Sequence, residues 1–237
     1  MEDNPKPFLE HLEELRVRLI KALAAVALGA MAAYHYADRA IGFLSRPVGG
    51  FVFLEPTEAF MSRLKVALAC GAVLAMPVVL YQAWKYVAVA LSPGERRPLY
   101  WLLPASYVLF VLGLSFGFLV LVPAGIRFLL GYSTPEIRPM ISVGRYLDFV
   151  GAVCLALGAV FQMPLLAYFL GRLGVLDAKW LAEKRAVAVL VVYAASALLT
   201  PGPDPVTAML LAVPTYALFE CSILSAKAAR PAGPPPA

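Results

Sequence analysis

Four glutamates at the edges of long apolar segments are the residues of this sequence whose types and positions could do chemistry. Glu10, Glu13 and Glu14 precede the first apolar segment, and Glu95 lies between the second and the third. The cytoplasmic ends of membrane helices normally collect Lys and Arg instead. Carboxylates at these ends could therefore bind a cationic ligand.

Local interactions offer an alternative role for two of these glutamates. Glu14 and Arg18 are four residues apart, which is the spacing of an ion pair along one helix. The residues SPGE at 92–95 have the pattern of a capping box, with Pro93 at the first helical position and Glu95 at the third. Spacing alone leaves both interpretations open.

The His and Cys residues predict neither a metal site nor a disulfide framework. His11 and His35 are 24 positions apart, and each of the three cysteines lies in an apolar segment away from any histidine. The sequence GLSFG at 113–117 has the letters of a nucleophile elbow, but its place within an apolar span favours a G-x-x-x-G packing face. We expect no catalytic residue, no cofactor and no enzyme activity.

The elements that position the glutamates are predicted to be membrane helices. The chain has 237 residues, of which 61% are hydrophobic and 15% charged, whereas a soluble protein has about a quarter charged. Because one bilayer crossing needs about 20 apolar residues, we predict an all-α membrane protein with six transmembrane helices in a single domain covering 1–225. The predicted spans lie at about 20–37, 66–91, 99–122, 149–171, 186–200 and 206–225.

The segments outside these spans also have a predicted structure. An amphipathic helix over 7–19 would align Phe8, Leu12, Leu15 and Leu19 along one stripe. The loops 38–65 and 123–148 are long enough to hold short helices and are expected to form a cap on the outer, periplasmic face. The tail 226–237 has a disordered composition.

The distribution of basic residues predicts how the chain is oriented. Thirteen of the 20 Lys and Arg residues fall on the side of the N-terminus and seven on the opposite side. By the positive-inside rule, both termini then face the cytoplasm. This distribution also accounts for the net charge of +5, and no basic run interleaved with aromatic residues indicates nucleic-acid binding.

The last predicted hairpin is unusual because both of its helices are expected to be short, the first being the segment AVAVLVVYAASALLT. Its 15 apolar residues extend about 22 Å at the helical rise, against roughly 30 Å of hydrocarbon. The connection TPGPDP at 200–205 places Asp204 as an N-cap and Pro205 at the first position of the last helix. Short helices of this kind are expected to thin the bilayer beside them.

Seven segments carry a resemblance to a known family over residues 8 to about 224. They are FLEHLEELRVRL (8–19), SRPV with Pro47, MPVVLYQAWKYVAVALSPGERR (76–97), FQMPLL (161–166), EKR (183–185), LLTPGPDP (198–205) and LLAVPTYALFE (210–220). Through these segments the chain resembles TatC, the multispanning core of the twin-arginine protein translocase.

The resemblance implies a receptor for folded cargo whose N-terminal signal peptide carries paired arginines. The family glutamates that contact these arginines match Glu14 and Glu95, and the planar guanidinium suits a carboxylate better than the ammonium of lysine does. The neighbouring positions expected to bind the signal peptide are His11, Leu15, Arg16 and Arg96. Residues expected to contact partner subunits or to serve as structural polar groups are Gln162, Asp204, Pro47, Tyr81, Gln82, Trp84 and Glu220.

The resemblance also implies a shape, partners and a location. It implies a glove-like, concave bundle in the bacterial cytoplasmic (inner) membrane. It further implies TatA-type and TatB-type single-span subunits, self-association in the receptor complex, and export driven by the proton-motive force. Four positions depart from the family pattern, since Gln162, Ala208 and Val89 replace a common Glu, Gln and Pro, and Gly202 is an extra residue in the last hairpin.

An ion-coupled secondary transporter of small solutes is the alternative from another functional class. Such a protein would show broken helices, polar groups at the midplane and an internal repeat. Four prolines supply possible helix breaks, but the chain shows no matching halves. These prolines are Pro77, Pro123, Pro164 and Pro214.

Overall fold

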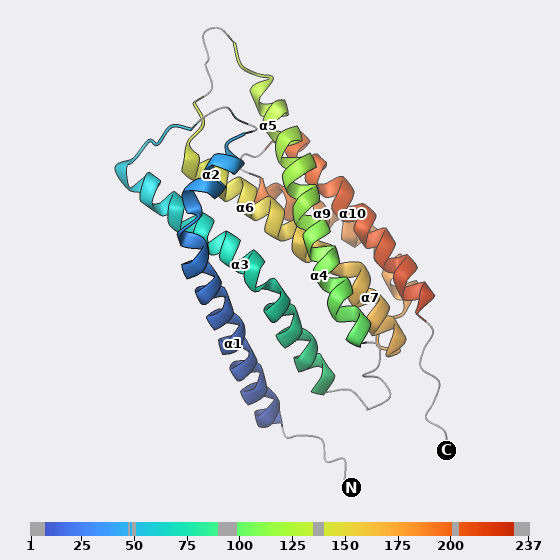
Figure 1. Cartoon of the computed structure of the whole chain (residues 1–237). Coiled ribbons are helices and arrows are strands. Elements are labelled where there is room, and N and C mark those ends of the chain that lie inside the picture. Colours follow the sequence, from blue (N-terminus) through green and yellow to red (C-terminus); the bar gives the residue numbers. More distant parts are fainter. Residues whose placement is uncertain are drawn as a thin grey trace, which may run out of the picture. The chain divides into compact units, whose positions relative to one another are not determined.

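The chain folds into α-helices throughout the part that its computed structural model describes, which is residues 8–46, 48, 51–89, 99–134, 140–200 and 204–229 (Figure 1). For 8–11, 89, 99 and 100 only the backbone is described. Within these ranges the one β-type pairing is an isolated bridge between Val52 and Ser142. The chain divides into two compact units, which we call the first unit (Met1–Gly42 and Arg63–Tyr107) and the second unit (Phe43–Ser62 and Val108–Ala237).

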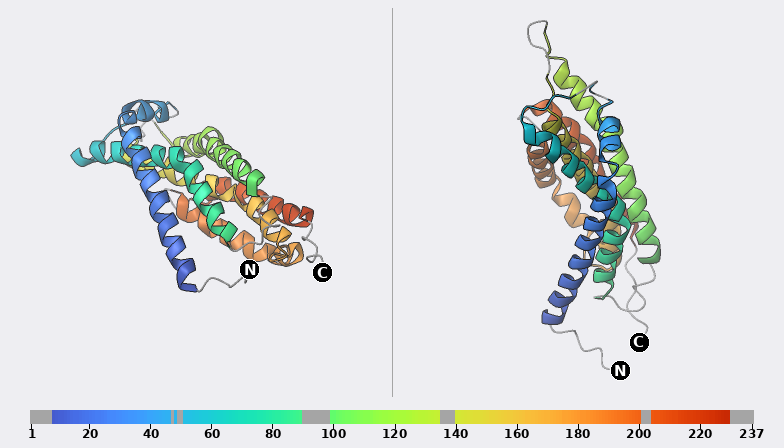
Figure 2. Two further views of the ribbon diagram at one scale, coloured as in Figure 1. Left: turned by 60° about the horizontal axis from the view of Figure 1, so that its bottom comes forward. Right: turned by 60° about the vertical axis from the view of Figure 1, so that its left-hand side comes forward.

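The first unit is built on two long helices, α1 (Phe8–Tyr34) and α3 (Pro56–Val89). They cross closely at two glycines, because a Cβ added to Gly29 would lie 2.6 Å from the carbonyl oxygen of Gly71. Such contacts let helix backbones approach inside a membrane. From this crossing the helices separate toward the N-terminus of α1 and the C-terminus of α3 (Figures 1 and 2). The crossing therefore sets the gap between those two ends.

Helix α1 is continuous through the position where the sequence predicted an interfacial helix to meet the first span. The predicted apolar stripe stays largely exposed in the described structure, since Leu12, Leu15 and Leu19 are 44%, 42% and 55% exposed. A short helix, α2 (Ala37–Leu44), follows in the segment predicted as an outer loop. Helix α3 begins ten residues before the span predicted at 66–91, so the charged residues before that span are also helical.

One long helical stretch, which passes from the first unit into the second after Tyr107, changes its winding along its length. Helix α4 (Leu99–Phe116) continues through a π-helical turn, η1 (Gly117–Leu121), into α5 (Val122–Leu130). The span predicted to end at 122 therefore continues to 130, because the helix passes through Pro123 directly after its winding changes at η1. Gly113 packs on the next helix, where an added Cβ would lie 2.7 Å from the carbonyl oxygen of Leu157. This contact agrees with the interpretation of GLSFG as a packing face.

The span predicted at 149–171 is divided into two helices. Helix α6 (Val143–Val160) ends before Phe161, and α7 (Met163–Arg172) begins directly after Gln162 with a proline in its first turn. A proline removes one backbone donor, which explains the interruption at this place. A short helix, α8 (Ala178–Glu183), then leads to the last hairpin.

The last hairpin consists of α9 (Arg185–Leu199) and α10 (Pro205–Ala228). Helix α9 has the predicted 15 residues, but α10 has 24, so only the first helix of this hairpin is short. Helix α10 also includes residues 226–228, which the sequence assigned to the disordered tail. The predicted cap at Asp204 is confirmed, because its carboxylate accepts a hydrogen bond of 2.6 Å from the backbone N–H of Thr207.

Within the described residues, five helical stretches are long and apolar enough to cross a membrane by themselves. They are Leu12–Tyr34, Pro56–Ala88, Trp101–Leu130, Val143–Arg172 and Pro205–Ala228. Helix α9, the fifth predicted span, is apolar but shorter than these. Five of the six predicted spans thus coincide with helices of spanning length, and a sixth crossing by α9 stays a prediction.

The two predicted outer loops contact each other within the second unit. Val52 pairs with both sides of Ser142, since its N–H donates to Ile141 and its carbonyl oxygen accepts from Val143. The carboxylate of Glu58 accepts hydrogen bonds from the hydroxyl of Ser142 and the N–H of Gly144. A single carboxylate therefore joins the start of α3 to the start of α6.

Candidate functional site

A cavity of about 330 Å³ lies within the first unit, where α1 and α3 separate. Its volume is at the lower end of the range of ligand pockets in proteins. Five of its lining residues lie at helical spacings on one side of α1, and the other two come from the last turns of α3. The lining residues are Glu13, Glu14, Val17, Arg18, Lys21, Gln82 and Lys85.

Glu14 and Arg18 form the central contact of this cavity. The Nε atom of Arg18 donates to Oε1 of Glu14 at 3.2 Å, and Nη2 of Arg18 donates to the same oxygen. The side chains of Arg18 and Glu14 are only 12% and 20% exposed. This confirms the ion pair predicted from the i, i+4 spacing.

Arg18 also connects the two helices that line the cavity. Its Nη1 atom donates to Oε1 of Gln82 at 3.4 Å. Gln82 belongs to α3, so one guanidinium bridges a carboxylate of α1 and an amide of α3. The sequence indicated the pair on α1, but it gave no sign of a partner 64 residues away.

The second oxygen of Glu14 is unused. Its Oε2 atom is buried and accepts no hydrogen bond from the described residues. A buried acceptor without a donor is unfavourable, and more so when it carries charge. Glu14 is therefore a carboxylate with one oxygen held and one oxygen in need of a donor.

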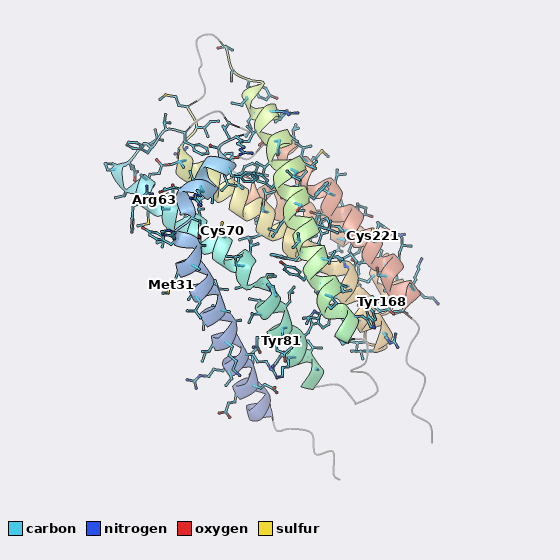
Figure 3. The ribbon with its side chains drawn as sticks, in the orientation of Figure 1. Met31, Arg63, Cys70, Tyr81, Tyr168 and Cys221 are labelled. Carbon is cyan, nitrogen blue, oxygen red and sulfur yellow. The ribbon has the colours of Figure 1, made fainter. Side chains whose placement is uncertain are left out.

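The described cavity lining carries more positive than negative charge. Glu13 and Glu14 face three cationic side chains, those of Arg18, Lys21 and Lys85. The ammonium of Lys85 lies 5.5 Å from the ring centroid of Tyr81, which is a cation–π contact; Figure 3 shows Tyr81 on α3. A bound cation would thus need negative charge beyond the described lining.

The other residues predicted to bind the signal peptide lie outside this cavity or outside the described residues. Leu15 and Arg16 are exposed on α1 and do not line it. The side chain of His11 lies outside the described residues, as do Glu95, Arg96 and Pro47. The predicted meeting of Glu14 with Glu95 stays a prediction.

Three of the predicted structural or partner-contacting polar groups hold the fold. Trp84 is buried, and its indole N–H donates to the Ser106 hydroxyl at 2.7 Å. Gln162 lies at the break between α6 and α7, where its side chain donates to the carbonyl oxygen of Gly158 at 3.5 Å. Asp204 caps α10, as described above.

Glu220 belongs to a polar cluster that the sequence analysis missed. Its two carboxylate oxygens accept from Nε and Nη2 of Arg185, each at 2.8 Å, and Oε1 also accepts from the Tyr216 hydroxyl. A signal for this pair was present in the sequence. Arg185 lies 15 residues before Thr200 and Glu220 lies 16 after Asp204, so an antiparallel hairpin brings them to one level.

Comparison with known proteins identifies relatives along almost the whole chain. The family model described as "Sec-independent protein translocase protein (TatC)" matches residues 10–214. A protein of Carboxydothermus hydrogenoformans named Sec-independent protein translocase protein TatC is 38% identical over 235 residues, which cover 98% of this chain and 97% of that protein. A protein of the same name from Desulforapulum autotrophicum is 36% identical, over 95% of this chain and 86% of its own length.

A solved structure shares the fold as well as the sequence. It is a crystal structure described as that of the twin arginine translocase receptor TatC, with a TM-score of 0.85 and 34% sequence identity. The superposition covers 92% of this chain and 99% of that one.

Proposed function

Because the chain belongs to the TatC family of Sec-independent protein translocase proteins, we propose that it is the twin-arginine signal-peptide receptor and core subunit of a Tat translocase. In this role it binds the signal peptide of folded cargo without catalysing a covalent reaction. The observation that carries the proposal is Glu14, a largely buried carboxylate at a cavity, with one oxygen to which no described residue donates.

The chemistry of the ligand fits this carboxylate. A guanidinium offers several N–H donors in a plane, so it can supply the donor that Oε2 of Glu14 lacks. We propose that Glu95 adds a third carboxylate beside Glu13 and Glu14, so that three anions balance the three cations of the lining and the net positive charge that would repel an arginine is removed. An ion-coupled solute transporter, the alternative considered from the sequence, gains no support from the relatives.

The proposed setting is the bacterial cytoplasmic membrane, with both termini in the cytoplasm and the cavity near the inner ends of α1 and α3. The basic residues support this orientation. We further propose six crossings and a periplasmic cap formed by the segments that Glu58 joins. Labelling of single cysteines with a membrane-impermeant reagent tests this topology, and labelling of position 58 only from the cytoplasmic side would contradict it.

The proposed partners are TatA-type and TatB-type single-span subunits and further copies of this chain, with export driven by the proton-motive force. Helix α9 is a suitable place for them, because its 15 residues are too few for an ordinary crossing and would thin the bilayer. Leu190 and Leu198 expose large apolar side chains there. A cryo-EM map in nanodiscs with no thinning beside α9 would contradict this part of the proposal.

Binding of a labelled signal peptide to the purified chain in nanodiscs tests the receptor function directly. Two peptides are compared that differ only by Arg-Arg or Lys-Lys at the paired position, which we call the RR and KK peptides. The chain variants are Glu14→Gln, Glu95→Gln and Glu183→Gln, the last being an exposed glutamate of α8 that serves as a matched control.

We expect RR to bind about tenfold more tightly than KK, since charged bidentate pairs are the stronger ones. Either site variant should remove this preference, and Glu183→Gln should keep it. Equal binding of RR and KK to the wild-type chain would overturn the proposal.

A further inference from the structure

We propose that Arg18 is a positioning residue, which with Gln82 holds Oε1 of Glu14 so that Oε2 is kept for an arginine of the ligand. The inference rests on the proposed function and adds a residue to its site. Sequence resemblance placed Glu14 in the site and spacing predicted its pair with Arg18, but the Gln82 contact and the use of a single Glu14 oxygen come from the structure alone.

Arg18 contacts only one of the two carboxylate oxygens of Glu14. In a fork-to-fork pair, a guanidinium places one donor on each carboxylate oxygen. Here Nε and Nη2 both donate to Oε1, and Oε2 has no donor among the described residues. The internal arginine thus uses half of the carboxylate and leaves the other half for a second guanidinium.

Arg18 is itself held in place by a contact with α3. Its Nη1 atom donates to Gln82 of α3 at 3.4 Å, and its side chain is 12% exposed. A side chain with contacts to two helices has little freedom to turn. It therefore fixes the orientation of the Glu14 carboxylate and also links α1 to α3 beside the cavity.

A lysine could not replace the arginine at position 18. A guanidinium has five N–H donors in one plane, and three of its nitrogen atoms are used by Glu14 and Gln82. An ammonium is a single point of charge at the end of a flexible chain. A lysine at position 18 could keep the charge next to Glu14 but not the fixed orientation.

Charge alone would predict the opposite role for Arg18. A cation in the cavity repels a cationic ligand, and an internal arginine could compete with the ligand for Glu14. Lys21 lines the same cavity and also carries a positive charge, but no described contact links it to Glu14. The variant Lys21→Gln is thus a matched control, because it removes one charge from the same place without touching the carboxylate.

The test measures the affinities for the RR and KK peptides in four variants, Arg18→Lys, Arg18→Gln, Gln82→Ala and Lys21→Gln, in nanodiscs. We expect both Arg18 variants to lower the affinity for RR about tenfold, the scale of one charged hydrogen-bond pair, with KK binding unchanged. Gln82→Ala should lower RR affinity less, about threefold, because it removes only one contact of Arg18. Lys21→Gln should keep or raise RR affinity.

Three outcomes would overturn the inference. Tighter RR binding by Arg18→Gln would make Arg18 a competitor of the ligand. An equal loss for RR and KK would mean that Arg18 only stabilises the fold. If the wild-type chain prefers RR and both Arg18 variants keep the same RR-to-KK ratio, Arg18 is not part of the site, but the proposed function stands. If the wild-type chain has no preference for RR, both the inference and the proposed function are wrong.

Discussion

Two arginine–glutamate pairs in this chain use the same chemical groups in different ways. In the first unit Arg18 places two donors on one oxygen of Glu14, and the other oxygen is buried without a donor among the residues that the structure describes. In the second unit Arg185 places one donor on each oxygen of Glu220, and Tyr216 adds another. The second carboxylate is saturated and the first is not.

The difference separates a structural pair from a binding site. A carboxylate whose oxygens all have donors gains little from a further cation, and an exposed pair contributes little to stability. A carboxylate that is largely buried with an unused oxygen gains a hydrogen bond when a donor arrives. Residue type alone does not distinguish Glu14 from Glu220, but the count of donors does.

The largest expected effect is the loss of ligand binding in Glu14→Gln. The amide removes the charge that pairs with the ligand, and a hydrogen bond to a charged group contributes about 1.5–3 kcal/mol. We expect the affinity for the RR peptide to fall about 10- to 100-fold. Fluorescence anisotropy in nanodiscs measures this affinity. A fall of less than threefold would contradict the distinction between Glu14 as a binding carboxylate and Glu220 as a structural one.

The next largest effect is expected at the crossing of α1 and α3, which supports the Glu14–Arg18 pair. In Gly71→Ala the new Cβ would lie 2.2 Å from the backbone nitrogen of Ala30, so α1 and α3 must move apart. Overpacking of this kind costs about 1–3 kcal/mol. We expect a lower melting temperature in detergent and weaker RR binding, because the cavity is lined by these helices.

Gly151→Ala is the matched control for that substitution. An added Cβ at Gly151 of α6 meets nothing within 4 Å, and alanine is the better helix former by about 1 kcal/mol. Its melting temperature should stay the same or rise. Equal destabilisation by the two substitutions would contradict a close crossing at Gly71.

The smallest effect is expected for the saturated pair. Glu220→Gln leaves Arg185 without its ion-pair partner, so α9 should be attached less firmly to α10. We expect a slightly lower melting temperature and an RR affinity unchanged within twofold. A large loss of RR binding by this variant would show that the count of donors does not identify the binding carboxylate.

Local features of the site and the fold were predictable from the sequence, and contacts between distant segments were not. The Glu14–Arg18 pair and the Asp204 cap follow from spacings of three and four residues, so short-range geometry determines them. The Gln82 contact joins positions 64 apart, and only the crossing of α1 with α3 brings them together. Such a crossing depends on backbone approach at Gly29 and Gly71, which a hydropathy pattern does not show.

The helix ends differed from the prediction for a related reason. A span predicted from hydropathy stops where charges begin, but a helix continues as long as its backbone hydrogen bonds can form. Helix α3 therefore includes Glu58 and Arg63, and the stretch after α4 continues through Pro123 to Leu130. Hydropathy does not show the break at Gln162, because both sides of it are equally apolar, and only Pro164 indicated a possible break there.

The central claim is that the arginines of the signal peptide lie in the cavity beside Glu14, and disulfide cross-linking tests it most directly. A signal peptide with one cysteine next to the arginine pair is oxidised with chains in which Cys70, Cys154 and Cys221 are replaced by alanine. Val17→Cys places a thiol in the cavity lining, and Met31→Cys places one on the exposed surface of the same helix; Figure 3 labels Met31 on α1. The account predicts a cross-link at position 17 with the RR peptide that is lost with KK and absent at position 31, and equal cross-linking at both positions would contradict it.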